Sequence, residues 1–144
     1  KDDYDYIIID CPPALGSITI NALSAANSVI IPIQCEFFAL EGLAQLLNTV
    51  KLIKKTINPT LDIKGFLPTM YSTQNNLSKQ VFADLKEHFK NKLFVDRETE
   101  SYVVIPRNIK LAESPSFGKP IILYDVESPG SKAYQNLANS ILAS

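Results

Sequence analysis

The chain has 144 residues, of which 46% are hydrophobic and 20% charged, a composition that supports one ordinary core and excludes intrinsic disorder. Lysine and arginine total 14 against 15 aspartate and glutamate residues, so the formal net charge is -1, and any nucleic-acid binding must come from a local patch. No apolar run approaches the roughly 20 residues that cross a bilayer, and no signal-peptide pattern opens the chain. We expect one domain over residues 1–144, in the cytoplasm, with Cys11 and Cys35 reduced.

Strand and helix patterns alternate along the chain. Continuous apolar runs, typical of strands covered on both faces, occur at residues 6–9, 28–33, 63–68 and 102–106. Helical spacing of apolar residues occurs at 18–26, 40–57, 77–89 and 133–142, the last preceded by a turn and helix start at Ser128-Pro129-Gly130. The run 121–123 is too short to assign. The chain does not begin with Met and enters a strand pattern almost at once, which indicates a piece of something longer.

The alternation predicts an α/β fold with a mostly parallel sheet and helices on both faces. Ligands of such folds bind at the carboxyl ends of the strands. Four segments follow predicted strands and are expected to converge on one site, namely residues 10–13, 34–36, 69–71 and 106–108.

Asp10 is the first candidate for chemistry. A carboxylate directly after a buried strand is the pattern of the Walker B aspartate, which faces a magnesium ion or its water shell. Capping of the following helix, or a simple strand end, explains the same residue. Pro12, Pro13 and Gly16 fit either a loop that responds to nucleotide or a plain tight turn.

Four segments together closely resemble the ParA/Soj family of DNA-partitioning ATPases, which belong to the deviant-Walker P-loop class. They are DYIIIDCPPALG at 5–16, INAL at 20–23, IPIQCEFFALEG at 31–42 and IPRNIKLAESPSFGKP at 105–120. The resemblance implies the C-terminal part of a P-loop NTPase (Rossmann-like) fold. The 144 residues contain no Gly-rich loop followed by Lys and Ser or Thr, so the phosphate-binding loop of the family lies outside them.

The resemblance also implies roles for single residues in a parent protein that uses ATP and Mg²⁺. Asp10 matches the catalytic and metal-side aspartate, and Cys11, Pro12 and Pro13 match the switch that follows it. The base pocket is expected to include these residues: Met70, Pro106 and Asn108. For Met70, filling of the core at a strand end is the alternative. We expect the parent to be an ATPase and this chain alone to be inactive.

The family implies nonspecific DNA binding, an ATP-dependent homodimer and a ParB/Spo0J-type partner at the nucleoid. The DNA-contact candidates are Arg107, Lys110 and Lys119, although Arg107 also fits a place against the nucleotide. The lysines at 51, 54 and 55 fit a solvated helix face better. Glu36 fits three roles, which are contact with the switch, contact with the dimer partner and capping of the helix that follows. Residues 94–101 are interpreted as a surface insertion.

Two other functions fit the sequence. The chain fits a noncatalytic DNA- or partner-binding module, which an ATP-binding assay distinguishes from an ATPase part. It also fits a MinD-like ATPase that cycles on membranes, but this class needs a basic amphipathic C-terminal helix, and residues 132–142 contain a single lysine. We therefore expect no membrane partner.

Overall fold

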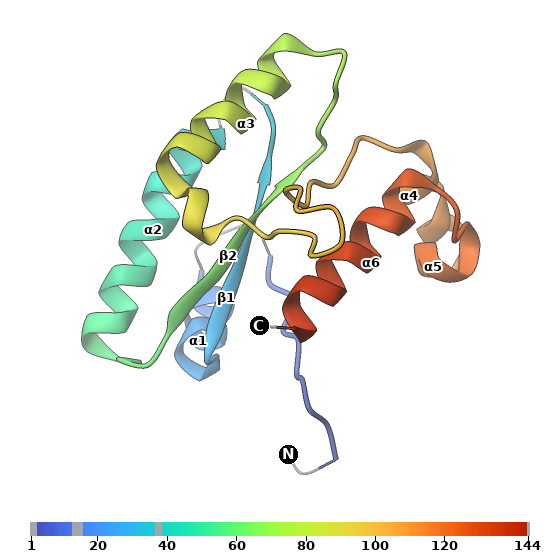
Figure 1. Cartoon of the computed structure of the whole chain (residues 1–144). Helices are drawn as coiled ribbons and strands as arrows, with labels where there is room; N and C mark the ends of the chain where they lie inside the picture. The colour runs from blue at the N-terminus through green and yellow to red at the C-terminus, as the bar shows by residue number, and fades with distance from the viewer. Residues whose placement is uncertain (1–2, 13–15, 37–38, 144) are drawn as a thin grey trace.

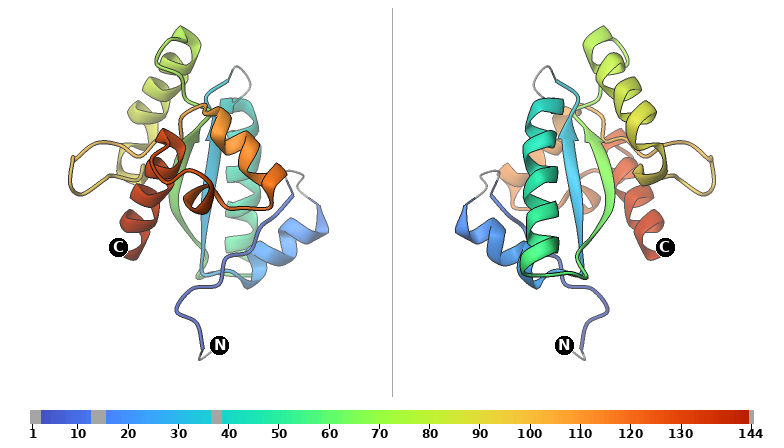
Figure 2. Two further views of the ribbon diagram at one scale, coloured as in Figure 1. Left: turned by 90° about the vertical axis from the view of Figure 1, so that its right-hand side faces the viewer. Right: turned by 90° about the vertical axis from the view of Figure 1, so that its left-hand side faces the viewer.

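The structure, a computed structural model, describes residues 3–12, 16–36 and 39–143. Its elements are α1 (Ser17–Ala25), β1 (Ser28–Gln34), α2 (Ala39–Thr56), β2 (Asp62–Thr69), α3 (Asn76–Phe89), η1 (Lys90–Lys92), α4 (Ile109–Glu113), η2 (Ser114–Phe117), α5 (Ile121–Tyr124) and α6 (Pro129–Leu142). Helices α2 and α3 lie on one face of the two strands, and α4, α5 and α6 lie on the other (Figures 1 and 2). The predicted α/β class is confirmed.

The strands β1 and β2 run parallel, as predicted. Ser28 aligns with Asp62 and Gln34 with Thr69, with one shift in register directly after Val29. Parallel strands need a crossover between them, and α2 supplies it. Because the register carries both strands to the same end, the residues after Gln34 and Thr69 leave the sheet side by side.

The predicted helices are confirmed with small changes in their bounds. Asn75 caps α3, since its Oδ1 accepts hydrogen bonds from the backbone N–H groups of Leu77 and Ser78. Ser128 caps α6 through the N–H of Ser131, so this helix begins at Pro129, directly after the predicted turn. Within the described ranges, no helix combines the length and the apolarity that crossing a membrane requires.

The core lies on both faces of the sheet because successive residues of a strand point to opposite sides. Phe66 belongs to a cluster toward α2 and α3, which also contains Ile33, Leu43 and Leu85. The next residue, Leu67, packs on the opposite side with Phe94, Val103 and Ile105, against Leu137 and Ile141 of α6. A third cluster joins α1 to α2 through Leu23, Val50, Ile53 and Leu61.

The strand predicted at 102–106 is not a regular strand. Only its end runs along β2, where the N–H of Ile105 donates to the carbonyl of Pro68 at 2.8 Å and Tyr71 bridges Pro106. The N–H of Val103 instead donates to the carbonyl of Phe94 at 2.9 Å. Prolines have no N–H, so Pro68 and Pro106 each interrupt the ladder as well.

The strand predicted at 6–9 is wrong. The structure assigns no strand to residues 3–12, and the side chain of Ile8 is 92% exposed. A run that is apolar on both sides is stable as a strand only when neighbours pair its edges and cover its faces. In the described part of the chain, β1 and β2 pair only with each other as a sheet, and neither pairs with this run.

The segment interpreted as an insertion is a hairpin loop that docks on α6. Val95 forms an antiparallel bridge with Tyr102. Asp96 accepts a hydrogen bond from Asn136 of α6 at 2.8 Å. The loop residues 97–101 are exposed, whereas Phe94 is buried in the core, so the surface part begins after Phe94.

Candidate functional site

Three of the four predicted segments meet at the carboxyl end of the sheet. The N–H of Cys35 donates to the carbonyl of Thr69 at 2.9 Å, which joins the ends of β1 and β2. The N–H of Tyr71 donates to the carbonyl of Ile105 at 3.1 Å, and the N–H of Arg107 donates to the carbonyl of Tyr71 at 2.9 Å. The predicted convergence is therefore confirmed for residues 34–36, 69–71 and 106–108, which we call the strand-end site.

Met70 makes the turn from β2 into this site. Its φ of +53° lies in the left-handed region, which is uncommon for a residue with a β carbon. Its side chain is 37% exposed, so it does not fill the core as the alternative interpretation required. Directly after this left-handed residue the chain pairs with the third segment, through the bridge between Tyr71 and Pro106.

A buried polar cluster fixes the loop after Met70. The Ser78 hydroxyl at the start of α3 accepts a hydrogen bond from the N–H of Ser72 at 3.0 Å. Burial raises the pKa of the adjacent Cys35 thiol, although hydrogen bonds with Ser78 and Thr69 oppose this effect. The sequence analysis missed Ser78, and the signal that was available is the Asn75 helix cap before an apolar periodic stretch.

An ion pair spans two of the converging segments. Arg107 Nη2 lies 2.6 Å from Glu36 Oε1, and both side chains are about half exposed. This contact with Arg107 is none of the three roles expected for Glu36. Because water screens an exposed pair, the contact joins the two loops without adding much stability.

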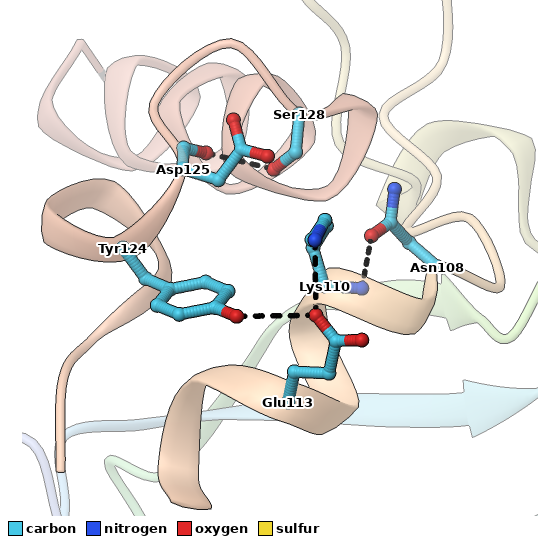
Figure 3. Close-up of polar contacts among 6 residues, drawn as sticks. All are labelled: Asn108, Lys110, Glu113, Tyr124, Asp125 and Ser128. Atoms are coloured by element: carbon cyan, nitrogen blue, oxygen red, sulfur yellow. Dashed lines mark hydrogen bonds and ion pairs between the residues drawn. The ribbon is translucent and has the colours of Figure 1, made fainter. Parts of the chain in front are cut away.

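After Arg107 the chain enters α4, and Asn108 caps the start of this helix. Its Oδ1 accepts a hydrogen bond from the N–H of Lys110 at 2.8 Å and so caps the helix (Figure 3). The Asn108 oxygen therefore already accepts one hydrogen bond, and the amide nitrogen, which points away from Lys110 in Figure 3, carries donors for a ligand. Pro106 is half-buried beside it.

A cluster of polar groups holds Lys110 itself (Figure 3). Lys110 Nζ lies 3.0 Å from Glu113 Oε2, and the Tyr124 hydroxyl donates to the same oxygen at 3.1 Å. The hydrogen bond with Glu113 and its charge raise the pKa of Lys110, and the hydrogen bonds from Lys110 and Tyr124 lower the pKa of Glu113. Burial and then Glu113 raise the pKa of Tyr124. The sequence analysis missed Glu113 and Tyr124, although the Lys110 to Glu113 spacing of three residues on a helix was a visible signal.

The remaining predicted residues lie apart from these contacts. Asp10 and Cys11 are exposed, and no hydrogen bond or ion pair joins Asp10 to the described ranges of the chain. Pro12 contacts α1 through its carbonyl, which accepts from Thr19 at 3.4 Å. Pro13 falls outside the described residues. Lys119 is exposed after η2 and, among the residues that the structure describes, forms no ion pair.

The donor groups present fit only part of a nucleotide and magnesium site. Mg²⁺ is commonly held by one or two carboxylates together with phosphate oxygens and water, and Asp10 can supply one such ligand. No group of three or more His, Cys, Asp or Glu side chains in the described ranges is placed to hold a metal ion. A cradle of backbone N–H groups for the phosphates is not encoded in the 144 residues. The 144 residues therefore encode no triphosphate cradle beside the strand-end site.

Comparison with known proteins gives a consistent result. A family model described as AAA domain matches residues 1–63. The chain is 53% identical over 143 residues to the sporulation initiation inhibitor protein Soj of Bacillus subtilis, covering 99% of this chain and 54% of that protein. It is 49% identical over 140 residues to the chromosome partitioning protein ParA of Myxococcus xanthus, covering 97% of this chain and 47% of that one.

Among solved structures, cobyrinic acid a,c-diamide synthase of Mycobacterium smegmatis with bound ADP and magnesium aligns with a TM-score of 0.71 at 33% identity, over 97% of this chain and 47% of that one. The chain spans about half the length of the relatives that it matches. With about half of its residues identical to theirs over nearly its whole length, the chain belongs to the ParA/Soj family of chromosome-partitioning proteins.

Proposed function

We propose that this chain is the C-terminal part of a ParA/Soj-type partitioning ATPase and that it contributes the base edge of the nucleotide site and a nonspecific DNA surface. The observation that carries the proposal is the convergence of residues 34–36, 69–71 and 106–108 at one end of the parallel strands. Ligands of parallel α/β sheets bind at this end. The names of the related proteins support chromosome partitioning as the process.

In this proposal the strand-end site receives the nucleotide base. Met70, which is exposed, and Pro106, which is half-buried, would supply apolar surface for the base, and Asn108 would offer its amide nitrogen. Asp10 belongs to the metal and phosphate side, which ATP and Mg²⁺ would occupy in the longer protein. The switch residues Cys11, Pro12 and Pro13 follow it in the sequence. When bound there, Mg²⁺ neutralises charge that develops on the phosphates. Asp10 would hold this ion or its water shell through its free carboxylate.

The DNA surface of the proposal is formed by Arg107, Lys110 and Lys119. Arg107 lies within the strand-end site, and Lys110 and Lys119 follow it along the chain, so nucleotide and DNA would be bound next to each other. They contact phosphates, which are the same in every sequence, and this predicts binding without sequence preference. A homodimer, a ParB/Spo0J-type partner and a place at the nucleoid in the cytoplasm complete the proposal.

Fluorescence anisotropy with labelled DNA duplexes of unrelated sequence tests the proposal. We expect the chain to bind all duplexes alike, with affinity that falls as salt rises. The double variant Arg107→Ala/Lys110→Ala should bind more weakly and with a flatter salt dependence. The matched control is Lys92→Ala/Lys132→Ala, which also removes two exposed, ion-paired cations, one from η1 and one from α6. Equal binding by the two double variants at every salt concentration would place the DNA surface elsewhere.

A noncatalytic binding module is the second candidate, and the absence of an encoded phosphate cradle favours it for the chain on its own. Binding of a fluorescent ATP analogue to the 144-residue chain separates the candidates. Saturable binding that competes with ATP supports the base edge. Lack of binding, together with intact DNA binding, supports the module.

A further inference from the structure

The positive charge of Lys110 is already engaged inside the chain. Its ammonium lies 3.0 Å from Glu113 Oε2 and 5.7 Å from the centre of the Tyr124 ring. A cation over an aromatic face is attracted by the ring quadrupole, so the ring adds to the attraction of the carboxylate. Lys110 is therefore held by two groups, one from its own helix and one from α5.

Tyr124 also determines where the Glu113 carboxylate points. Its hydroxyl donates to the same Oε2 atom that contacts Lys110 (Figure 3). The ring of Tyr124 is in turn stacked on Phe117, with centroids 5.1 Å apart and planes 29° from parallel. The stacked ring and the hydrogen bond keep the carboxylate directed at the lysine. We call Lys110, Glu113 and Tyr124 the Lys110 cluster.

The three cations of the proposed DNA surface are not equally available. Arg107 is paired with Glu36 at 2.6 Å and Lys110 with Glu113 at 3.0 Å. Lys119 forms no ion pair with the residues that the structure describes. Two carboxylates thus offset two of the three charges before any phosphate approaches, and they would stand beside a bound phosphate and repel it.

We propose that Glu113, held in place by Tyr124, competes with the nucleic-acid phosphate for Lys110 and so limits the affinity of this surface. The inference rests on the proposed DNA-binding function. An exposed ion pair is weak enough to exchange, and a phosphate oxygen replaces the carboxylate with another charge-assisted hydrogen bond. Binding is then an exchange of partners by Lys110, which favours ready release of DNA.

Glu113→Gln is the direct test, because glutamine keeps the shape of the side chain and removes its charge. We expect the affinity for a labelled duplex to rise about two- to five-fold, the range that loss of an exposed ion pair allows. The slope of log affinity against log salt should become steeper, by at most the roughly 0.9 that one full phosphate contact contributes. Tyr124→Phe, which frees the carboxylate but leaves the ring, should change affinity in the same direction by less.

The matched control is Glu127→Gln. Glu127 is paired with Lys132 at 2.8 Å, so this variant makes the same change in net charge and also breaks one exposed lysine pair, outside the Lys110 cluster. Its effect on affinity should be smaller than that of Glu113→Gln. In a Lys110→Ala background, Glu113→Gln should lose its advantage over Glu127→Gln. Circular dichroism checks that each variant is folded.

Each outcome decides the inference. Equal effects of Glu113→Gln and Glu127→Gln overturn it, because net charge alone then explains the change. Weaker binding by Glu113→Gln also overturns it and makes Glu113 a residue that positions Lys110 for phosphate. In both cases the wild-type chain binds DNA and the proposed function stands. If neither the wild type nor Glu113→Gln binds DNA at the lowest salt, the DNA-binding proposal fails and this inference with it.

Discussion

A β carbon on Gly65 would lie 2.7 Å from two ring carbons of Phe94 and 2.8 Å from the carbonyl oxygen of Lys92. Glycine at this position therefore lets the chain after η1 pack directly on β2, where Leu93 bridges Phe66. Phe94 is part of the core toward α6, so its ring cannot move away without opening that core.

Gly65→Ala should therefore destabilise the protein by about 1–3 kcal/mol, the usual cost of extra volume in a packed site. Gly42→Ala is the matched control, since nothing lies within 4 Å of a β carbon there and the residue is inside α2. That variant should gain up to about 1 kcal/mol from helix propensity. Urea denaturation measures the free energy of unfolding of both variants. A Gly65→Ala protein as stable as the wild type would contradict the packing described.

The two cysteines should differ sharply in reactivity. Cys11 is exposed, whereas Cys35 is 2% exposed and its burial raises the pKa of the thiol. Because the thiolate is the reactive form, iodoacetamide near neutral pH should modify Cys11 first and Cys35 only after denaturation. Peptide mass spectrometry over time measures this. In Cys11→Ser the fast reaction should disappear, and rapid labelling of Cys35 in the folded chain would contradict its burial.

Replacement of Asp10 should impair the binding or turnover of nucleotide in the longer protein and leave the stability of the chain unchanged. Its carboxylate makes no hydrogen bond or ion pair with the described part of the chain, so Asp10→Ala should leave the urea midpoint of the 144-residue chain unchanged. In a longer ParA/Soj-type protein that carries this sequence, the same change should impair magnesium-dependent nucleotide binding or turnover.

Asp5→Ala is the control for this position, because Asp5 is exposed on the same segment. It should leave nucleotide binding and turnover intact. Unchanged kinetics in Asp10→Ala would remove Asp10 from the site.

The 144-residue chain alone should not hydrolyse ATP. Phosphoryl transfer depends on a phosphate loop, its lysine and the metal ligands acting together, and the sequence encodes no such loop. A coupled phosphate-release assay with and without magnesium measures the rate, with an intact P-loop ATPase assayed in parallel. Magnesium-dependent turnover that survives further purification would refute the prediction.

The chain should associate with itself or be only marginally stable. Ile7 and Ile8 are 66% and 92% exposed, and exposed apolar segments and unpaired strand edges favour contact with another chain. Sedimentation velocity over a dilution series should show association, and Ile8→Gln should reduce it. Leu52→Gln removes a comparably exposed side chain, 60% exposed on α2, and should have no such effect. A stable monomer at every concentration would show that this surface is tolerated.

Elements with a long amphipathic period or an apolar run between clear turns were predicted well from sequence. The α2, α3 and α6 helices and the β1 and β2 strands lie within a few residues of their predicted bounds. These elements complete their hydrophobic contacts within the chain, so local pattern and final structure agree. The runs at 6–9 and 102–106 have equally strong strand patterns, but their state depends on which neighbours pair with them, and residue pattern carries no such information.

For the strand-end site, the sequence identified the converging segments and not the contacts within them. The order of strands and helices is enough to place residues 34–36 and 106–108 at one end of a parallel sheet. The spacing of three residues on a helix was a signal for the Lys110–Glu113 pair, but the contact between Glu36 and Arg107 depends on side-chain directions in loops, which residue spacing leaves undetermined. Tyr124 could be named only once α4 and α5 were seen to lie together (Figure 3).

The interrupted ladder beside β2 leaves the strand-end site with few backbone hydrogen bonds. Three of them, made by the N–H groups of Tyr71, Ile105 and Arg107, connect residues 68–71 to the chain that leads into α4. We expect these bonds to open more readily than the ladder between β1 and β2, because fewer neighbouring bonds support them. The amide protons of these three residues would then exchange with solvent faster than those of the two strands, and nucleotide or DNA that holds the edge closed would slow that exchange.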